Sequence, residues 1–67
     1  MAKIQLNGKK IKIYKDLNIT GLLRKYNLDM KKIAVELNGE ILQKSYYGKK
    51  KLRDKDKIEI VQFIGGG

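Results

Sequence analysis

The stretch Lys57-Ile58-Glu59-Ile60-Val61-Gln62-Phe63 decides the fold that the sequence predicts. Its first half alternates polar and apolar side chains, which is the pattern of a strand with one buried face. Its second half is apolar on both faces, through Ile60, Val61 and Phe63. Such a strand is usually central in a sheet, or it presents one face to a partner. We therefore expect a central strand here, with Val61 and Phe63 either in the core or on a docking surface.

Two earlier segments predict hairpins. Residues 3–6 and 10–13 alternate polar and apolar side chains around Asn7-Gly8, and residues 33–37 and 40–42 flank Asn38-Gly39. Asn-Gly is the strongest short-range hairpin signal, because both residues adopt positive φ readily. The side chains expected to share the buried face of the first hairpin are Ile4, Leu6, Ile11 and Ile13.

Between the hairpins, the spacing of apolar residues predicts one helix. The stripe has positions i, i+3, i+4 and i+7 and consists of Ile19, Leu22, Leu23 and Tyr26. Asn18 is a good N-cap, and Asn27 suits the left-handed residue after the helix. Gly21 inside the helix costs about 1 kcal/mol relative to alanine.

The order of elements is hairpin, helix, hairpin, irregular segment, strand. This order predicts an α+β fold in which one helix packs across one face of a mixed sheet, the ubiquitin-like β-grasp layout. The last strand would lie beside the first and run parallel to it. Tyr46 or Tyr47 would anchor the irregular segment. We expect residues 1–64 to form the β-grasp domain and residues 65–67 to form a flexible tail.

Composition removes most catalytic chemistry from the side chains. The chain has 67 residues and contains neither cysteine nor histidine. Disulfides, zinc ribbons, thiol nucleophiles and the commonest general base are therefore excluded. The remaining polar residues form no suggestive cluster, so if the protein takes part in chemistry, its reactive group is expected at a chain terminus. The first residues carry no long apolar run, and no stretch approaches the ~20 apolar residues of a membrane span. We expect a cytoplasmic protein without a membrane partner.

The net charge is +9, from 16 Lys+Arg against 7 Asp+Glu. Only Arg24 and Arg53 among the basic residues are arginine, whereas specific phosphate and base recognition favours arginine forks. A solvated lysine-rich surface is thus the favoured interpretation, and a nucleic-acid partner is not expected. The alternative, a small basic nucleic-acid-binding domain, would use Lys44, Lys49, Lys50 and Lys51 with Tyr46 and Tyr47.

The run Gly65-Gly66-Gly67 has two interpretations. It is either a frayed terminus or a tail that threads a narrow channel, since glycine has no Cβ atom to block passage. Three residues reach at most ~10 Å. That length suffices to place the carboxylate of Gly67 in the nucleotide site of another protein, where ATP would convert it to an acyl adenylate. A sulfur nucleophile would then displace AMP and leave a thiocarboxylate.

The chain resembles the ThiS family, the ubiquitin-like sulfur carriers of thiamine thiazole biosynthesis, over essentially its whole length. The matching pieces are Ile4-Gln5-Leu6-Asn7-Gly8, Asn18-Ile19-Thr20-Gly21-Leu22-Leu23, residues 34–41 and residues 56–67. The last piece is the most specific, because an apolar strand runs through Phe63 and Ile64 directly into the glycines.

The resemblance implies a co-substrate rather than an enzyme. An E1-like adenylyltransferase of the ThiF type would adenylate Gly67 with ATP and magnesium, so that this chain binds no cofactor itself. A donor such as a cysteine desulfurase would supply sulfur, and thiazole synthase would accept it. Gly65 and Gly66 would thread the partners' channels, and Val61, Phe63 and Ile64 would form an apolar docking patch. A carrier for another pathway, such as molybdopterin synthesis, or a ubiquitin-like modifier would have the same fold and tail.

Overall fold

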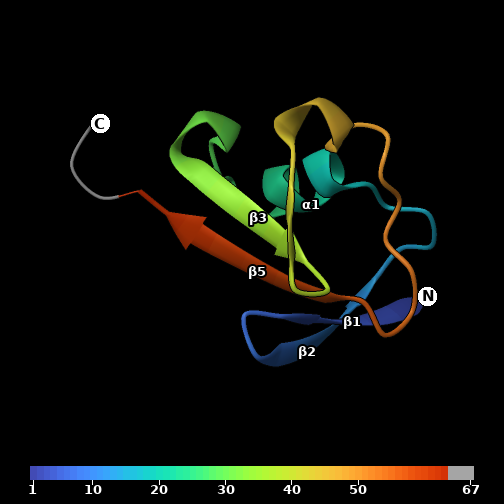
Figure 1. Ribbon diagram of the computed structural model, residues 1–67. Coiled ribbons are helices and arrows are strands. Elements are labelled where there is room, and N and C mark those ends of the chain that lie inside the picture. Colours follow the sequence, from blue (N-terminus) through green and yellow to red (C-terminus); the bar gives the residue numbers. More distant parts are fainter. Residues whose placement is uncertain (64–67) are drawn as a thin grey trace.

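The structure, a computed structural model, describes residues 1–63, and in this part of the chain the strands form one mixed sheet (Figure 1). The strand order is β2-β1-β5-β3-β4. The strands are β1 (Ala2–Leu6), β2 (Lys9–Ile13), β3 (Ile33–Leu37), β4 (Glu40–Leu42) and β5 (Lys57–Gln62). The helix α1 (Ile19–Lys25) covers one face, and two short 3-10 turns are η1 (Met30–Lys32) and η2 (Lys44–Tyr46). The α+β, ubiquitin-like β-grasp architecture expected from the sequence is confirmed.

Strand β5 is central, as its pattern predicts. It pairs in parallel with β1, where Leu6 lies opposite Ile58, and antiparallel with β3, from Ile33 opposite Gln62 to Leu37 opposite Ile58. Ile58 is therefore flanked by strands on both sides and is fully buried. The last strand thus runs through the middle of the sheet, and the residues that follow it leave at one end of the sheet.

The asparagines of the two Asn-Gly turns hold β5 in addition to shaping the turns. Asn7 and Asn38 have φ of 47° and 52°, as type I′ turns require. The Asn7 Oδ1 atom accepts the Ile60 N–H at 2.7 Å, and the Asn38 Oδ1 atom accepts the Lys57 N–H at 2.8 Å. Each side chain thereby continues the hydrogen bonding of β5 where a neighbouring strand has turned away.

Helix α1 begins and ends as expected, but the exposure of Tyr26 and the surroundings of Gly21 differ from the expectation. Asn18 caps it by accepting the Gly21 N–H at 2.7 Å, and Asn27 takes φ of 55° beyond its end. Tyr26, however, lies at the C-cap and is 42% exposed, so the apolar stripe has three core members rather than four. A Cβ atom on Gly21 would lie 2.6 Å from Leu17 Cδ1 and 3.2 Å from the capping oxygen. Glycine at this position therefore relieves crowding as well as weakening the helix.

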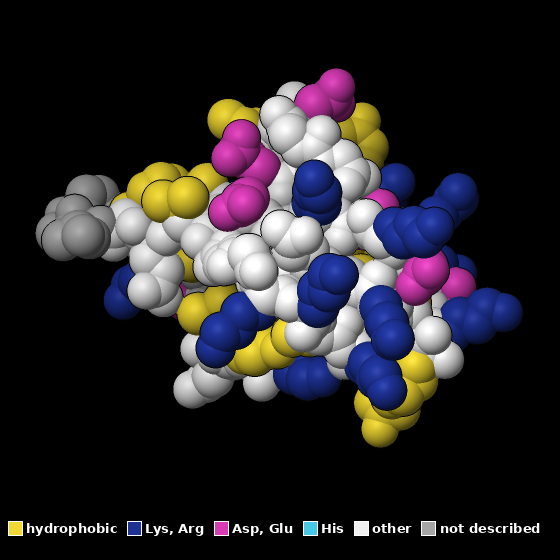
Figure 2. Space-filling model, turned by 90° about the horizontal axis from the view of Figure 1, so that it is seen from below, with side chains coloured by type: hydrophobic (Ala, Val, Ile, Leu, Met, Phe, Trp, Pro, Cys, Tyr) yellow, Lys and Arg dark blue, Asp and Glu magenta, His cyan; other side chains and the backbone are white. Residues whose placement is uncertain are grey.

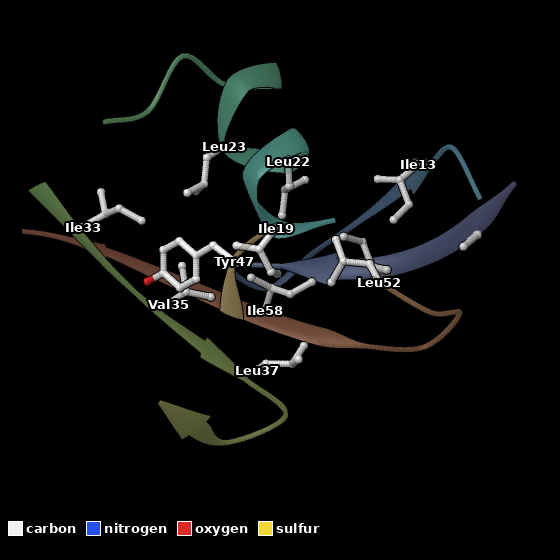
Figure 3. Packing of buried hydrophobic residues seen from close by; sticks show 12 residues of the cluster. Ile13, Ile19, Leu22, Leu23, Ile33, Val35, Leu37, Tyr47, Leu52 and Ile58 are labelled. Carbon is white, nitrogen blue, oxygen red and sulfur yellow. The ribbon is translucent and has the colours of Figure 1, made fainter. Parts of the chain in front are cut away.

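The core lies between α1 and the sheet and includes the irregular segment (Figure 3). The buried side chains are Ala2, Ile4, Ile13, Ile19, Leu22, Leu23, Ile33, Val35, Leu37, Tyr47, Leu52 and Ile58. Tyr47 is 1% exposed and Tyr46 is 52% exposed, so of the two tyrosines Tyr47 is the one that anchors the segment between β4 and β5. Leu52 of the same segment is buried as well. Within residues 1–63 no helix is long and apolar enough to cross a membrane.

Candidate docking surface at the end of β5

Val61 and Phe63 lie on the surface and not in the core. Their exposed fractions are 54% and 57%. Ile58 points toward the helix and is buried, so by the alternation of a strand Val61 points to the opposite face of the sheet. Phe63, just beyond β5, is held by the end of η1, because its N–H donates to the Lys32 carbonyl at 2.8 Å. Of the two interpretations of these residues, the structure confirms exposure.

The register places a defined set of neighbours beside Val61 on this open face. Val61 lies opposite Ala34, and in the next row Glu59 lies opposite Glu36. Glu36 in turn lies opposite Ile41 of β4, which is 76% exposed. An apolar and acidic surface therefore adjoins the end of β5, in which Ala34 and Glu36 are partly exposed and the other members are exposed. This surface consists of Ala34, Glu36, Ile41, Glu59, Val61 and Phe63, and we call it the exit face.

The other end of the same sheet face is basic. Lys3 lies opposite Lys12, and Gln5 lies between Lys10 and Lys57. A shallow cavity of about 330 Å³ lies there, and its charged lining residues are four lysines and one aspartate: Lys3, Lys10, Lys55, Lys57 and Asp54. Figure 2, which views the molecule from below, shows acidic side chains beside apolar ones toward the end that carries the grey residues, whereas toward the other end lysines and arginines predominate, with some acidic and apolar side chains among them.

The remaining predicted site residues, Ile64, Gly65, Gly66 and Gly67, lie outside the described residues. The same holds for the predicted boundary between domain and tail. Of the predicted site residues, the structure therefore describes Val61 and Phe63, which lie on the same surface at the end of β5. Glu36, Glu59 and Ile41 were not predicted as site residues, because their proximity depends on the β3–β5 and β3–β4 registers. One of these contacts could have been predicted from the Asn38-Gly39 turn. A two-residue turn at this position sets the register of the hairpin and places Ile41 opposite Glu36.

The alternative nucleic-acid contact set is not assembled as proposed. The ring of Tyr47 is buried beneath the irregular segment and is not available for stacking on a base. Burial raises the pKa of the Tyr47 hydroxyl from its ordinary value of 10.0, and a hydrogen bond with the Val35 backbone partly opposes that shift. Tyr46 alone remains exposed beside the lysines. Among residues 1–63 no group of histidine, cysteine, aspartate or glutamate side chains is arranged to hold a metal ion.

Together, the mixed sheet with its central β5 and the helix across one face define a small protein of the ubiquitin-like β-grasp class. The model of the ThiS family matches residues 4–67. The sulfur carrier protein ThiS of Bacillus subtilis is 49% identical over 65 residues, which cover 96% of this chain and 98% of that protein. The chain belongs to the ThiS family, whose members are sulfur carriers in thiamine biosynthesis.

Two further relatives bear on the fold and on partners. The crystal structure of the thiamine biosynthesis protein ThiS from Geobacter metallireducens superposes with a TM-score of 0.83 at 32% identity, covering 97% of this chain and 99% of that one. A thiazole synthase of Paramagnetospirillum magneticum is 42% identical over 65 residues, which cover 97% of this chain but only 20% of that enzyme. A segment similar to this whole chain is therefore part of a much longer thiazole synthase.

Proposed function

We propose that the carboxylate of Gly67 is the sulfur-carrying group of this protein and that the protein is a co-substrate without catalytic residues of its own. The observation that supports this most directly is the extent of the family match, which runs through residue 67 and so includes all three glycines. The exposed Val61 and Phe63 add support, because they give a partner an apolar surface directly before this segment. The cytoplasmic location expected from the sequence stays a prediction.

The proposed chemistry takes place on partner enzymes. A carboxylate oxygen of Gly67 attacks the α-phosphorus of ATP, pyrophosphate leaves, and an acyl adenylate forms on a ThiF-type adenylyltransferase that uses magnesium. The terminal sulfur of a persulfide, supplied by a donor such as a cysteine desulfurase, then attacks the acyl carbon and displaces AMP. A second thiol attacks the donor sulfur of the resulting acyl disulfide, forms a disulfide there and releases the thiocarboxylate.

The proposed acceptor of that sulfur is thiazole synthase. Support comes from the thiazole synthases in which a segment resembles this chain, since a carrier and the enzyme that uses it benefit from a high effective concentration. Once the sulfur has bonded to the acceptor, an oxygen of the acceptor or of water attacks the acyl carbon and breaks the carbon–sulfur bond. The Gly67 carboxylate is thereby regenerated, so the protein can be used repeatedly.

The experiment is intact-mass spectrometry after incubation with the adenylyltransferase, ATP, magnesium and a sulfur donor. The starting mass first establishes that Gly67 is the chain end. A mass increase that corresponds to one oxygen replaced by sulfur, located in a C-terminal peptide, is the expected result. A variant lacking Gly66 and Gly67 should keep the fold and gain no sulfur. No shift with an enzyme proven active on its own carrier would refute the proposal and favour a carrier for another pathway or a modifier.

A second experiment addresses the apolar surface. Phe63→Ala should raise the KM for adenylation about tenfold, because exposed aromatic anchors commonly dominate docking energy. Stability should change little, since the ring is more than half exposed. Tyr14→Ala is the matched control, because Tyr14 is also an exposed aromatic residue but follows the end of β2 near the start of β1. Equal KM values for the two variants would show that Phe63 does not contribute to docking.

A further inference from the structure

Glu36 and Glu59 form an unfavourable pair that the composition does not require. They lie directly opposite each other on β3 and β5, and both belong to the exit face. Cβ atoms of opposed residues are about 4.5–5.5 Å apart, and like charges in this arrangement destabilise a sheet. The chain has only 7 acidic residues against 16 basic ones, so chance alone would more often place a lysine beside each glutamate. The pair is thus a candidate for a role outside the isolated fold.

The pair also occupies a particular place in the charge pattern of the open face. Successive rows along the sheet are Lys12–Lys3, then Lys10–Gln5–Lys57, then Glu59–Glu36–Ile41, then Val61–Ala34. Charge therefore changes from positive to negative to apolar toward the end of β5, and Figure 2 shows acidic side chains beside apolar ones toward one end of this view. Lys31 and Lys32 lie in η1, and Phe63 bonds to the Lys32 backbone, so this end is not free of cations.

We propose that the Glu36–Glu59 pair receives a cationic side chain of the adenylating enzyme, while Val61 and Ile41 supply apolar contacts on either side. This inference rests on the proposed function. An arginine guanidinium fits best, because its planar fork donates to two carboxylates at once. A bound guanidinium offsets the repulsion between the two glutamates, so the unfavourable energy of the pair in the free protein is relieved when the complex forms.

Charge complementarity identifies the adenylating enzyme as the partner. An enzyme that binds ATP surrounds the phosphates with cationic groups, and the resulting positive potential extends to the mouth of its site. A protein with net charge +9 is repelled by such a surface unless it presents its acidic residues first. The exit face does so next to the segment that must enter the site, and the lysine rows lie farther back on the same sheet.

The test compares Glu36→Gln, Glu59→Gln and the double variant with wild type. In the double variant the KM for the carrier in adenylation should rise about five- to tenfold at low salt, with kcat nearly unchanged. Wild-type KM should rise with ionic strength, and the KM of the double variant should respond less. The melting temperature of the double variant should rise by roughly 1–4 °C, because the cross-strand repulsion is gone.

Glu40→Gln is the matched control. It removes the same charge from an exposed position, but Glu40 lies opposite Leu37, whose side chain faces the core, and so it is not on the exit face. Its KM should equal that of wild type. A wild-type KM in the double variant, or a lower melting temperature, would overturn the inference. A defect confined to sulfur delivery would assign the pair to thiazole synthase instead. If wild type gains no sulfur at all, the proposed function itself fails.

Discussion

Tyr47 joins the irregular segment to the core, together with Leu52 farther along the same segment. Its ring is buried between that segment and the sheet, close to Val35, whereas the neighbouring Tyr46 is half exposed. The sequence predicted that one of these two tyrosines anchors the segment but not which one. The choice depends on how η2 orients the chain, and a 3-10 turn of three residues has no periodicity from which to read a buried side.

The buried hydroxyl makes a prediction about alkaline pH. Because the pKa of Tyr47 is raised in the folded protein, its contribution to stability is fully present below pH 10 and is lost as pH rises through the folded pKa. Above pH 10 the wild type should lose up to about 1.4 kcal/mol per pH unit relative to Tyr47→Phe. Urea denaturation between pH 8 and about 11 measures this difference. Tyr46→Phe should follow wild type, and a Tyr47→Phe curve parallel to wild type would contradict the assignment.

At the scale of elements, β5 depends on two side chains that lie outside it. The sequence predicted Asn7 and Asn38 as turn residues, because Asn-Gly between alternating stretches is a local signal. Their second role, accepting the N–H groups of Ile60 and Lys57, involves contacts 53 and 19 residues apart in the chain. Local patterns contain no information about such partners, so this part of the fold was not predictable until the sheet order was known.

Removing either side chain while keeping the turn conformation should therefore weaken the sheet. Asn7→Gly and Asn38→Gly preserve positive φ but leave a β5 N–H without its acceptor, so each should lower the free energy of unfolding by about 1 kcal/mol. Asn27→Gly is the matched control. It has φ of 55° as well, but its side chain takes no part in holding β5. Urea denaturation of the three variants provides the measurement, and equal losses in all three would show that glycine flexibility alone is responsible.

At the scale of the whole molecule, the sequence predicted the sheet, the helix, their order and the central place of β5. It also predicted Val61 and Phe63 as partner-binding residues. It did not determine whether they are exposed, since an apolar residue on a central strand suits core and interface equally. The acidic half of the exit face was not predictable, because it arises only when β3 and β5 pair in one register. One residue of slip would place Glu36 on the core face.

The net charge of +9 makes a further prediction at this scale. Self-repulsion among the cations should destabilise the folded protein at low ionic strength, and salt should screen it. Raising sodium chloride from about 0.01 M to 1 M should increase the melting temperature by roughly 3–8 °C. Circular dichroism at several salt concentrations measures the effect. A decrease with salt would mean that attractive ion pairs outweigh the repulsion.

The central place of β5 also has a consequence during synthesis. Strand β5 is the last element of the described chain, yet it separates the β1–β2 hairpin from the β3–β4 hairpin. A nascent chain that lacks it has two hairpins and no strand to join them, so the sheet cannot close until translation has passed residue 62. The protein therefore folds only when synthesis has reached the glycines or has stopped just before them. Premature termination anywhere earlier yields an unfolded chain for proteolysis rather than a folded protein that would occupy partners without a working end.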